Sequence, residues 1–196
     1  MDKDAIPTKL LWVDLEMTGL DPLKDVILEI AAEVTDFNFK TIASYEARIK
    51  HDRDKVIKLF AANNWYRDTV PENRDSFLAS LDKSKDSDQV EQELIEFVHK
   101  HFGNEHAILS GNSIHNDRQF IKQWWPGLDL KLHYRMLDVS AWKIVMQGKY
   151  AVIFNKNSTH QAFDDIQASI AELQFYLDWF KNNGVVDAST DMITRV

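Results

Sequence analysis

The alternation of apolar and polar positions divides the chain into segments with a strand period and segments with a helix period. Period-two alternation and short apolar runs bounded by turn residues predict strands at residues 9–17, 27–37, 41–49, 107–111 and 134–139. Apolar positions at helical spacing predict helices at residues 53–70, 76–81, 90–101, 113–125, 140–147 and 159–181. This order predicts an α/β protein in which a mixed five-stranded sheet contains an antiparallel meander and is flanked by helices.

Local signals mark where several of these helices begin or end. Proline removes a helix hydrogen bond, so Pro71 is expected to end the first helix. Ser87 or Asp88 is expected to cap the helix that follows the polar loop before it. Ser158 and Gln161 have the spacing of a capping box, which predicts the start of the last helix.

Length and composition indicate a single enzyme-sized unit. No linker, repeat or low-complexity tract divides the 196 residues, so residues 1–183 are expected to form one domain. Residues 184–196 have weak periodicity and are expected to form a disordered tail. The chain has no cysteine, which excludes disulfides and thiolate metal sites. Because no secretory signal or bilayer-length apolar stretch is present, we expect a cytoplasmic protein without a membrane partner.

The charge balance limits the kind of nucleic acid that the chain is expected to bind. Acidic residues outnumber basic residues by 31 to 23, for a net charge of −8. Sequence-independent binding to long nucleic acids depends on a basic surface that releases counterions. A nuclease with this balance is expected to carry a local basic patch or to take very small substrates.

Two acids continue one face of the first predicted strand. Leu10, Trp12, Asp14 and Glu16 share that face because strand side chains alternate. An Asp-x-Glu pair alone is also typical of a strand that has reached water. However, acids that continue an apolar face are unfavourable unless a cation or a donor compensates them. Asp14 and Glu16 are therefore candidate metal ligands.

The remaining chemistry lies at two predicted helix starts. Asp117 follows a small-residue turn, and His160 precedes the adjacent acids Asp164 and Asp165. Acids near a helix N-terminus are also stabilised by the helix dipole alone. Asp165 lies beside the apolar stripe of its helix, so it is the better candidate of the pair.

Together these residues have complementary chemistry. Four carboxylates are hard ligands for two divalent cations, Mg²⁺ or Mn²⁺. Such ions, about 4 Å apart, stabilise the attacking and leaving oxygens of an in-line displacement. A histidine with an ordinary pKa of about 6.5 can accept the proton of the attacking water. The set predicts hydrolysis of phosphodiester bonds.

The same residues lie in motifs that resemble those of the oligoribonucleases, a branch of the DEDDh 3′–5′ exonucleases with a ribonuclease-H-like fold. The resemblance extends over roughly residues 9–181. The matching motifs are residues 12–21, 111–114 with 117–118, 133–135 with 137–140, and 159–162 with 164–166.

The resemblance implies a role for each candidate residue. Asp14, Glu16, Asp117 and Asp165 would hold the two metals, with Glu16 also counted as catalytic and His160 as the general base. The implied substrates are short RNAs, especially dinucleotides, which are released as 5′-mononucleotides.

The resemblance also implies how the substrate is held. Leu20 and Trp65 match positions that sandwich the bases, although a tryptophan in this place is as often part of the core. Asn112 and Ser113 are assigned to substrate binding, with Ser113 near the 5′ phosphate. The family forms homodimers, in which Tyr134 would reach the active site of the partner.

One segment departs from the family pattern. Oligoribonucleases usually carry a histidine after the matching tryptophan, which closes off the phosphate end of the substrate, whereas this chain has Val70. Strict preference for two nucleotides, and for ribose over deoxyribose, is therefore left open. The alternative is a DEDDh exonuclease that acts on short DNA or on DNA 3′ ends.

Overall fold

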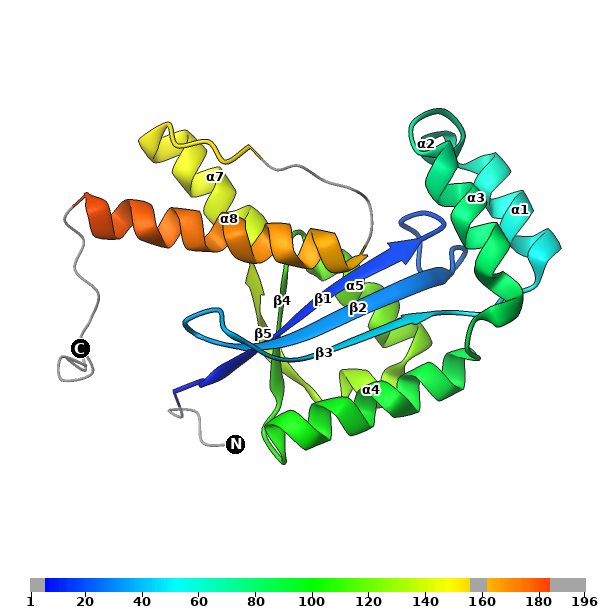
Figure 1. Ribbon diagram of the computed structural model, residues 1–196, viewed down its shortest axis with the longest axis horizontal. Helices are drawn as coiled ribbons and strands as arrows, with labels where there is room; N and C mark the ends of the chain where they lie inside the picture. The colour runs from blue at the N-terminus through cyan, green and yellow to red at the C-terminus, as the bar shows by residue number, and fades with distance from the viewer. Residues whose placement is uncertain (1–5, 156–161, 184–196) are drawn as a thin grey trace.

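The computed structural model describes residues 6–155 and 162–183. The strands form one mixed sheet in the order β3-β2-β1-β4-β5 (Figure 1). β2 runs antiparallel to β1 and β3, whereas β4 runs parallel to β1 and β5. The bounds are β1 (Lys9–Met17), β2 (Ile27–Asp36), β3 (Thr41–Arg48), β4 (Ala107–Gly111) and β5 (Leu132–Asp138). The predicted mixed five-stranded sheet with its antiparallel meander is confirmed.

Helices cover both faces of the sheet and one of its ends (Figure 1). α7 and α8 pack against the face that carries Trp12, while α4, α5 and α6 pack against the face that carries Val13. α1, α2 and α3 form a third cluster around Leu28. The bounds are α1 (Arg53–Ala62), α2 (Asn64–Asp68), α3 (Pro71–Ser80), α4 (Ser87–Phe102), α5 (His115–Trp124), α6 (Pro126–Asp129), α7 (Val139–Tyr150) and α8 (Ala162–Asn182).

β1 is the central strand and is buried on both faces over most of its length. Trp12 and Val13 are 0% and 4% exposed, on opposite faces. Burial on both sides explains why this strand reads as a nearly continuous apolar run. Only at its C-terminal end does the face under α8 become acidic, with Asp14 opposite Ala31 and Glu16 opposite Glu29 in the register with β2.

The prediction of one helix over residues 53–70 is wrong, because the helix is interrupted at Asn63. Asn63 ends α1 with an extended backbone and caps α2, its side chain accepting a hydrogen bond from the Trp65 amide. Pro71 does not end a helix but stands in the first turn of α3. A proline fits there because the first turn of a helix leaves its N–H groups unpaired.

Two other predicted helix starts are also displaced. α4 begins at Ser87 with Asp86 as its N-cap, so neither Ser87 nor Asp88 caps it. The hydroxyl of Ser87 instead accepts a hydrogen bond from the Trp125 indole, 3.0 Å away. α5 begins at His115 and not at Ser113, whose φ of 51° is incompatible with an α-helix.

Several predictions lie outside the described residues. These are the capping box of Ser158 and Gln161, the general base His160, and the disordered tail over residues 184–196. Among the helices of the described ranges, none combines the length and the apolar character that crossing a bilayer requires.

Candidate active site

Three carboxylates from two distant segments meet above β1. Asp14 and Glu16 continue the strand face on which α8 packs, and Asp165 lies buried in the first turn of α8. One carboxylate oxygen from each residue lies within 4.8 Å of those from the other two. Oxygen ligands at this spacing suit Mg²⁺ or Mn²⁺. The structure thus brings together three of the four predicted metal ligands.

Asp117 lies beside this group. Its Oδ1 accepts a hydrogen bond from the backbone amide of Leu15 at 2.9 Å, between the two acids of β1. Asp117 stands in the first turn of α5 and is 6% exposed. Burial raises the pKa of this carboxyl group to about 7, and the Leu15 amide opposes that shift. The fourth predicted ligand is therefore anchored to the strand that carries the first two.

Three other carboxylates act on Glu16. Burial is the largest cause that raises the pKa of Glu16 to about 8, and the nearby carboxylates of Asp165, Glu29 and Asp117 act in the same direction. A divalent cation would relieve this repulsion, so the electrostatics fit a metal site. Both the oxygen ligands and their negative charge are therefore suited to a divalent cation.

Tyr66 is a site residue that the sequence did not single out. Its hydroxyl donates to the Met17 carbonyl at 2.8 Å, and it lies close enough to Glu16 to lower the pKa of that carboxyl group. The ring is buried against Phe60, with ring centroids 4.5 Å apart. Tyr66 thus docks α2 onto the acidic end of β1. Its position in a mainly polar stretch carried no signal of this contact.

We expect the metal-free protein to lose stability as the pH rises, because of Glu16. The pKa of Glu16 is about 8 in the folded protein, against an ordinary value of 4.5. Between these two values the folded protein retains a proton that the unfolded chain has released. The free energy of unfolding therefore falls through that window and is highest below it. Urea unfolding in EDTA across this range should show the slope.

Glu16→Gln is the test of this assignment. The variant should have a flatter dependence of stability on pH, because the amide does not titrate. A slope identical to that of the wild type would show that other groups cause the dependence.

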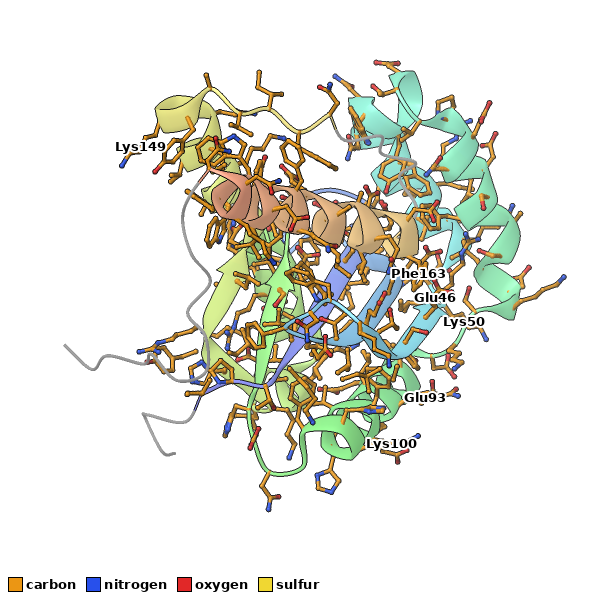
Figure 2. The ribbon with its side chains drawn as sticks, turned by 60° about the vertical axis from the view of Figure 1, so that its left-hand side comes forward. Glu46, Lys50, Glu93, Lys100, Lys149 and Phe163 are labelled. Atoms are coloured by element: carbon orange, nitrogen blue, oxygen red, sulfur yellow. The ribbon has the colours of Figure 1, made fainter. Side chains whose placement is uncertain are left out.

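A cavity is lined by residues of β2, β3 and the start of α8. It has a volume of about 350 Å³ and is lined by Glu29, Glu46, Ala47, Arg48 and Phe163. Figure 2 shows Phe163 and Glu46 at this side of the molecule, where the start of α8 approaches β3. Arg48 Nε lies 2.5 Å from Glu29 Oε2, which compensates the charge of Glu29. None of the three acids lines the cavity, but Glu29, which does, stands opposite Glu16 in the register of β1 and β2.

Leu20 and Trp65 are held in place by one side chain. Leu20 is 72% exposed and Trp65 is 47% exposed. The Asn63 side chain accepts from the Trp65 amide at 3.0 Å and donates to the Thr18 carbonyl at 2.8 Å. It therefore bridges the loop that carries Leu20 and the helix that carries Trp65. The exposure of Trp65 removes the alternative that it belongs wholly to the core.

The loop that carries Leu20 is constrained by Asp25. The carboxylate of Asp25 accepts from the Thr18 hydroxyl at 2.9 Å and from the Asp21 amide at 3.0 Å. A Cβ at Gly19 would come within 2.5 Å of Asp25 Oδ2, so only glycine allows this close approach. Leu20 is thereby presented on an ordered loop at the end of β1.

Asn112 and Ser113 form the turn between β4 and α5. Ser113 lies in the left-handed region, and its amide is held by Asp138 Oδ1 at 3.0 Å and by Ser140 Oγ at 2.9 Å. The Asn112 amide group points into α8, where it donates to Ser169 Oγ at 2.9 Å. Asp138 and Ser140 lie in one of the motifs that carry the family resemblance. Their contact with Ser113 depends on tertiary packing, so the sequence did not indicate it.

Tyr134 and Val70 are not part of the three-carboxylate group. Tyr134 is 67% exposed on β5, an edge strand that β4 separates from β1. Arg135 lies over its ring, 5.3 Å from the centroid. Val70 is the N-cap residue of α3 and packs against the cluster formed by α1, α2 and α3. Val70 is the position at which the resemblance led us to expect a histidine, and it makes an apolar packing contact.

Comparison with known proteins agrees with this geometry. A family model described as Exonuclease matches residues 11–173. An oligoribonuclease of Francisella tularensis subsp. novicida (strain U112) is 39% identical over 173 residues, which cover 85% of this chain and 93% of that protein. A probable oligoribonuclease of Caenorhabditis elegans is 40% identical over 177 residues, which cover 88% of this chain and 89% of that protein.

Solved structures with the same fold are more distant in sequence. Exonuclease I from Methylocaldum szegediense matches with a TM-score of 0.55 and 15% identity, over 91% of this chain and 42% of that chain. E. coli exonuclease I in complex with a dT13 oligonucleotide matches with a TM-score of 0.58 and 13% identity, over 90% of this chain and 42% of that chain. The chain spans less than half the length of these exonucleases, and the likeness confirms the ribonuclease-H-like fold. The family model and the relatives at about 40% identity show that the chain belongs to the oligoribonuclease family of exonucleases.

Proposed function

We propose that the protein is a metal-dependent 3′–5′ exoribonuclease that hydrolyses short oligoribonucleotides, especially dinucleotides, to 5′-mononucleotides. The observation that carries the proposal is the convergence of carboxylate oxygens from Asp14, Glu16 and Asp165 within 4.8 Å of one another. The family membership supports the same activity.

The proposed cofactors are two divalent cations, Mg²⁺ or Mn²⁺, with Asp14, Glu16, Asp117 and Asp165 as ligands. When bound, such ions supply charge stabilisation to the attacking and leaving oxygens. The chain contributes a rigid frame, because two ligands stand on β1 and Asp117 is hydrogen-bonded to the same strand. Rigid ligands keep the geometry of the reacting atoms fixed.

His160 is proposed as the general base that takes the proton from the attacking water. The support is its spacing from Asp165 in the sequence and the chemistry of the imidazole group. A neutral imidazole accepts this proton near neutral pH without disturbing the carboxylates.

The bases of the substrate are proposed to stack against Leu20 and Trp65. Stacking on an aromatic side chain contributes about 1–3 kcal/mol per base, which is a large share of the affinity for a dinucleotide. The net charge of −8 also favours a substrate with few phosphates. Ser113 and Asn112 are proposed to lie on the phosphate side, with Ser113 at the 5′ phosphate.

Trp65→Ala is expected to raise the KM for a diribonucleotide by about tenfold, with a smaller change in kcat, because base stacking is lost in the ground state and the transition state alike. Steady-state kinetics on a diribonucleotide measure both constants. Phe37→Ala is the matched control, since Phe37 is also 47% exposed but stands beyond the far end of β2. An unchanged KM in Trp65→Ala would contradict the stacking role.

The protein is proposed to act as a homodimer in which Tyr134 enters the active site of the partner. Exposed apolar side chains on β5, on α7 and in the turn before β5 support an interface. Leu130, Met136, Ile144 and Val145 are 75%, 38%, 72% and 50% exposed.

A mixed dimer tests the shared site. Tyr134→Ala alone and Asp14→Asn alone should each lose activity, and mixing the two variants should restore it in heterodimers. In these, one site combines intact acids with an intact tyrosine from the other protomer. No recovery in a mixture shown to contain heterodimers would contradict the arrangement.

The substrate length is tested with 5′-labelled RNAs of two to seven nucleotides, whose products are resolved over time. We expect the fastest turnover for the dinucleotide. Longer substrates should be shortened one residue at a time from the 3′ end. Internal cleavage, or faster turnover with each added nucleotide, would contradict the proposed function.

Val70 gives a specific reason to keep the alternative of a DNA-directed exonuclease. Val70, which packs against the cluster of α1, α2 and α3, stands where the resemblance implies a histidine at the phosphate end of the substrate. Ribose and deoxyribose differ at the 2′-OH, so direct comparison of RNA and DNA substrates decides between the two functions.

A further inference from the structure

A buried charge on α8 is unexplained by the proposed chemistry. Glu172 is 0% exposed. Its Oε1 accepts from the Tyr176 hydroxyl at 2.8 Å, and its Oε2 accepts from Asn112 Nδ2 at 3.2 Å. The Lys143 ammonium lies 4.0 Å from Oε1. Burying a carboxylate is unfavourable, and an apolar residue of similar size often serves stability as well. The hydrogen bonds that the Glu172 carboxylate accepts are therefore expected to have a role other than packing the core.

Hydrogen bonds lead from Glu172 to the turn that carries Asp165. Asn112 Nδ2 also donates to Ser169 Oγ at 2.9 Å. Ser169 Oγ in turn donates to the carbonyl of Asp165 at 2.8 Å. One amide group at the end of β4 thus contacts two residues of α8, and one of these binds the backbone of the candidate ligand.

The spacing of these residues along α8 shows why the register of the helix determines where Asp165 points. Asp165, Ser169, Glu172 and Tyr176 are four, three and four residues apart, so they lie on one helix face. Each residue advances an α-helix by about 1.5 Å and turns it by about 100°. A shift of α8 by a single residue against β4 would therefore turn Asp165 away from Asp14 and Glu16.

We propose that Asn112 and Glu172 are positioning residues that lock the register of α8 against the sheet and so hold Asp165 at the metal site. This rests on the proposed function, in which Asp165 is a metal ligand. The same network reaches the phosphate side, because the Ser140 hydroxyl donates to Asn112 Oδ1 at 3.2 Å and lies 3.1 Å from the Ser113 hydroxyl. Asn112 thereby also fixes the turn that carries Ser113.

The test is the affinity of the metal-free protein for Mn²⁺, measured by calorimetry without substrate. Glu172→Met keeps the size of the side chain but removes both acceptors, and it should weaken Mn²⁺ binding by about tenfold or more, as for other residues that orient ligands. Ser169→Ala removes the hydroxyl that joins Asn112 to the Asp165 carbonyl but leaves the bond between Asn112 and Glu172 in place, and it should weaken binding by a smaller factor. If Glu172→Met does not fold, Ser169→Ala still tests the inference.

Two controls separate positioning from charge and from stability. Glu172→Gln removes the same charge but retains an oxygen that accepts from Asn112, so its affinity should stay near that of the wild type. Leu173→Ala removes a neighbouring apolar contact on α8; it should lower the melting temperature and leave the Mn²⁺ affinity unchanged.

Equal Mn²⁺ affinity in Glu172→Met, Ser169→Ala and the wild type would overturn the inference, as would a loss in Glu172→Gln as large as that in Glu172→Met. Failure of the wild type itself to bind Mn²⁺ would instead overturn the proposed function. The two failures are therefore distinguishable.

Discussion

Asp14→Asn is expected to abolish hydrolysis while making the metal-free protein more stable. Losing one of two β1 ligands removes several kcal/mol of transition-state stabilisation, which corresponds to a rate loss of about a thousandfold or more. The same change removes one negative charge from the carboxylate cluster, in which mutual repulsion already helps to raise the pKa of Glu16. Relief of this repulsion should raise the melting temperature in EDTA.

The two effects have opposite signs, so they are measured together. Initial rates on a diribonucleotide and thermal unfolding with and without Mn²⁺ give both. Mn²⁺ should stabilise the wild type strongly and the variant weakly. Asp164→Asn is the matched control, because it makes the same chemical change on an exposed residue next to Asp165. Asp14→Asn with full activity would remove Asp14 from the metal site.

His160→Ala is expected to reduce turnover by about 100- to 10,000-fold, the range associated with loss of general base catalysis. Because His160 is proposed as a base and not as a ligand, the Mn²⁺ affinity should stay close to that of the wild type. The acidic limb of the pH–rate profile, which protonation of this imidazole would cause in the wild type, should disappear.

Single-turnover rates and Mn²⁺ calorimetry separate the two roles of His160. A loss of metal affinity as large as the loss of rate would identify His160 as a ligand. An acidic limb that persists in the variant would assign it to a carboxylate instead.

The arrangement of the acids on β1 could be predicted from the sequence because it depends on local geometry. Side chains alternate along a strand, so Asp14 and Glu16 had to share the face of Trp12. A strand that is apolar on both faces had to be buried at the centre of a sheet. That Asp165 joins the two acids was implied by the resemblance and not by periodicity, and the packing of α8 on this face was not predicted.

Contacts between distant segments could not be predicted in this way. The hydrogen bond from Asn63 to Thr18 and that from Asn112 to Glu172 join residues 45 and 60 positions apart. No period or spacing in the sequence identifies such partners. The break at Asn63 was missed for a related reason, since its amide side chain satisfies both a helix cap and a tertiary contact.

The most direct test of the proposed function compares an RNA dinucleotide and a DNA dinucleotide of the same base sequence, each with Mn²⁺ and saturating substrate. The 5′ label is identical on both, and Asp14→Asn provides the background rate. We expect faster turnover of the RNA dinucleotide, with a labelled 5′-mononucleotide as the product. Faster turnover of the DNA dinucleotide would contradict the proposed function and would assign the chain to exonucleases that act on short DNA.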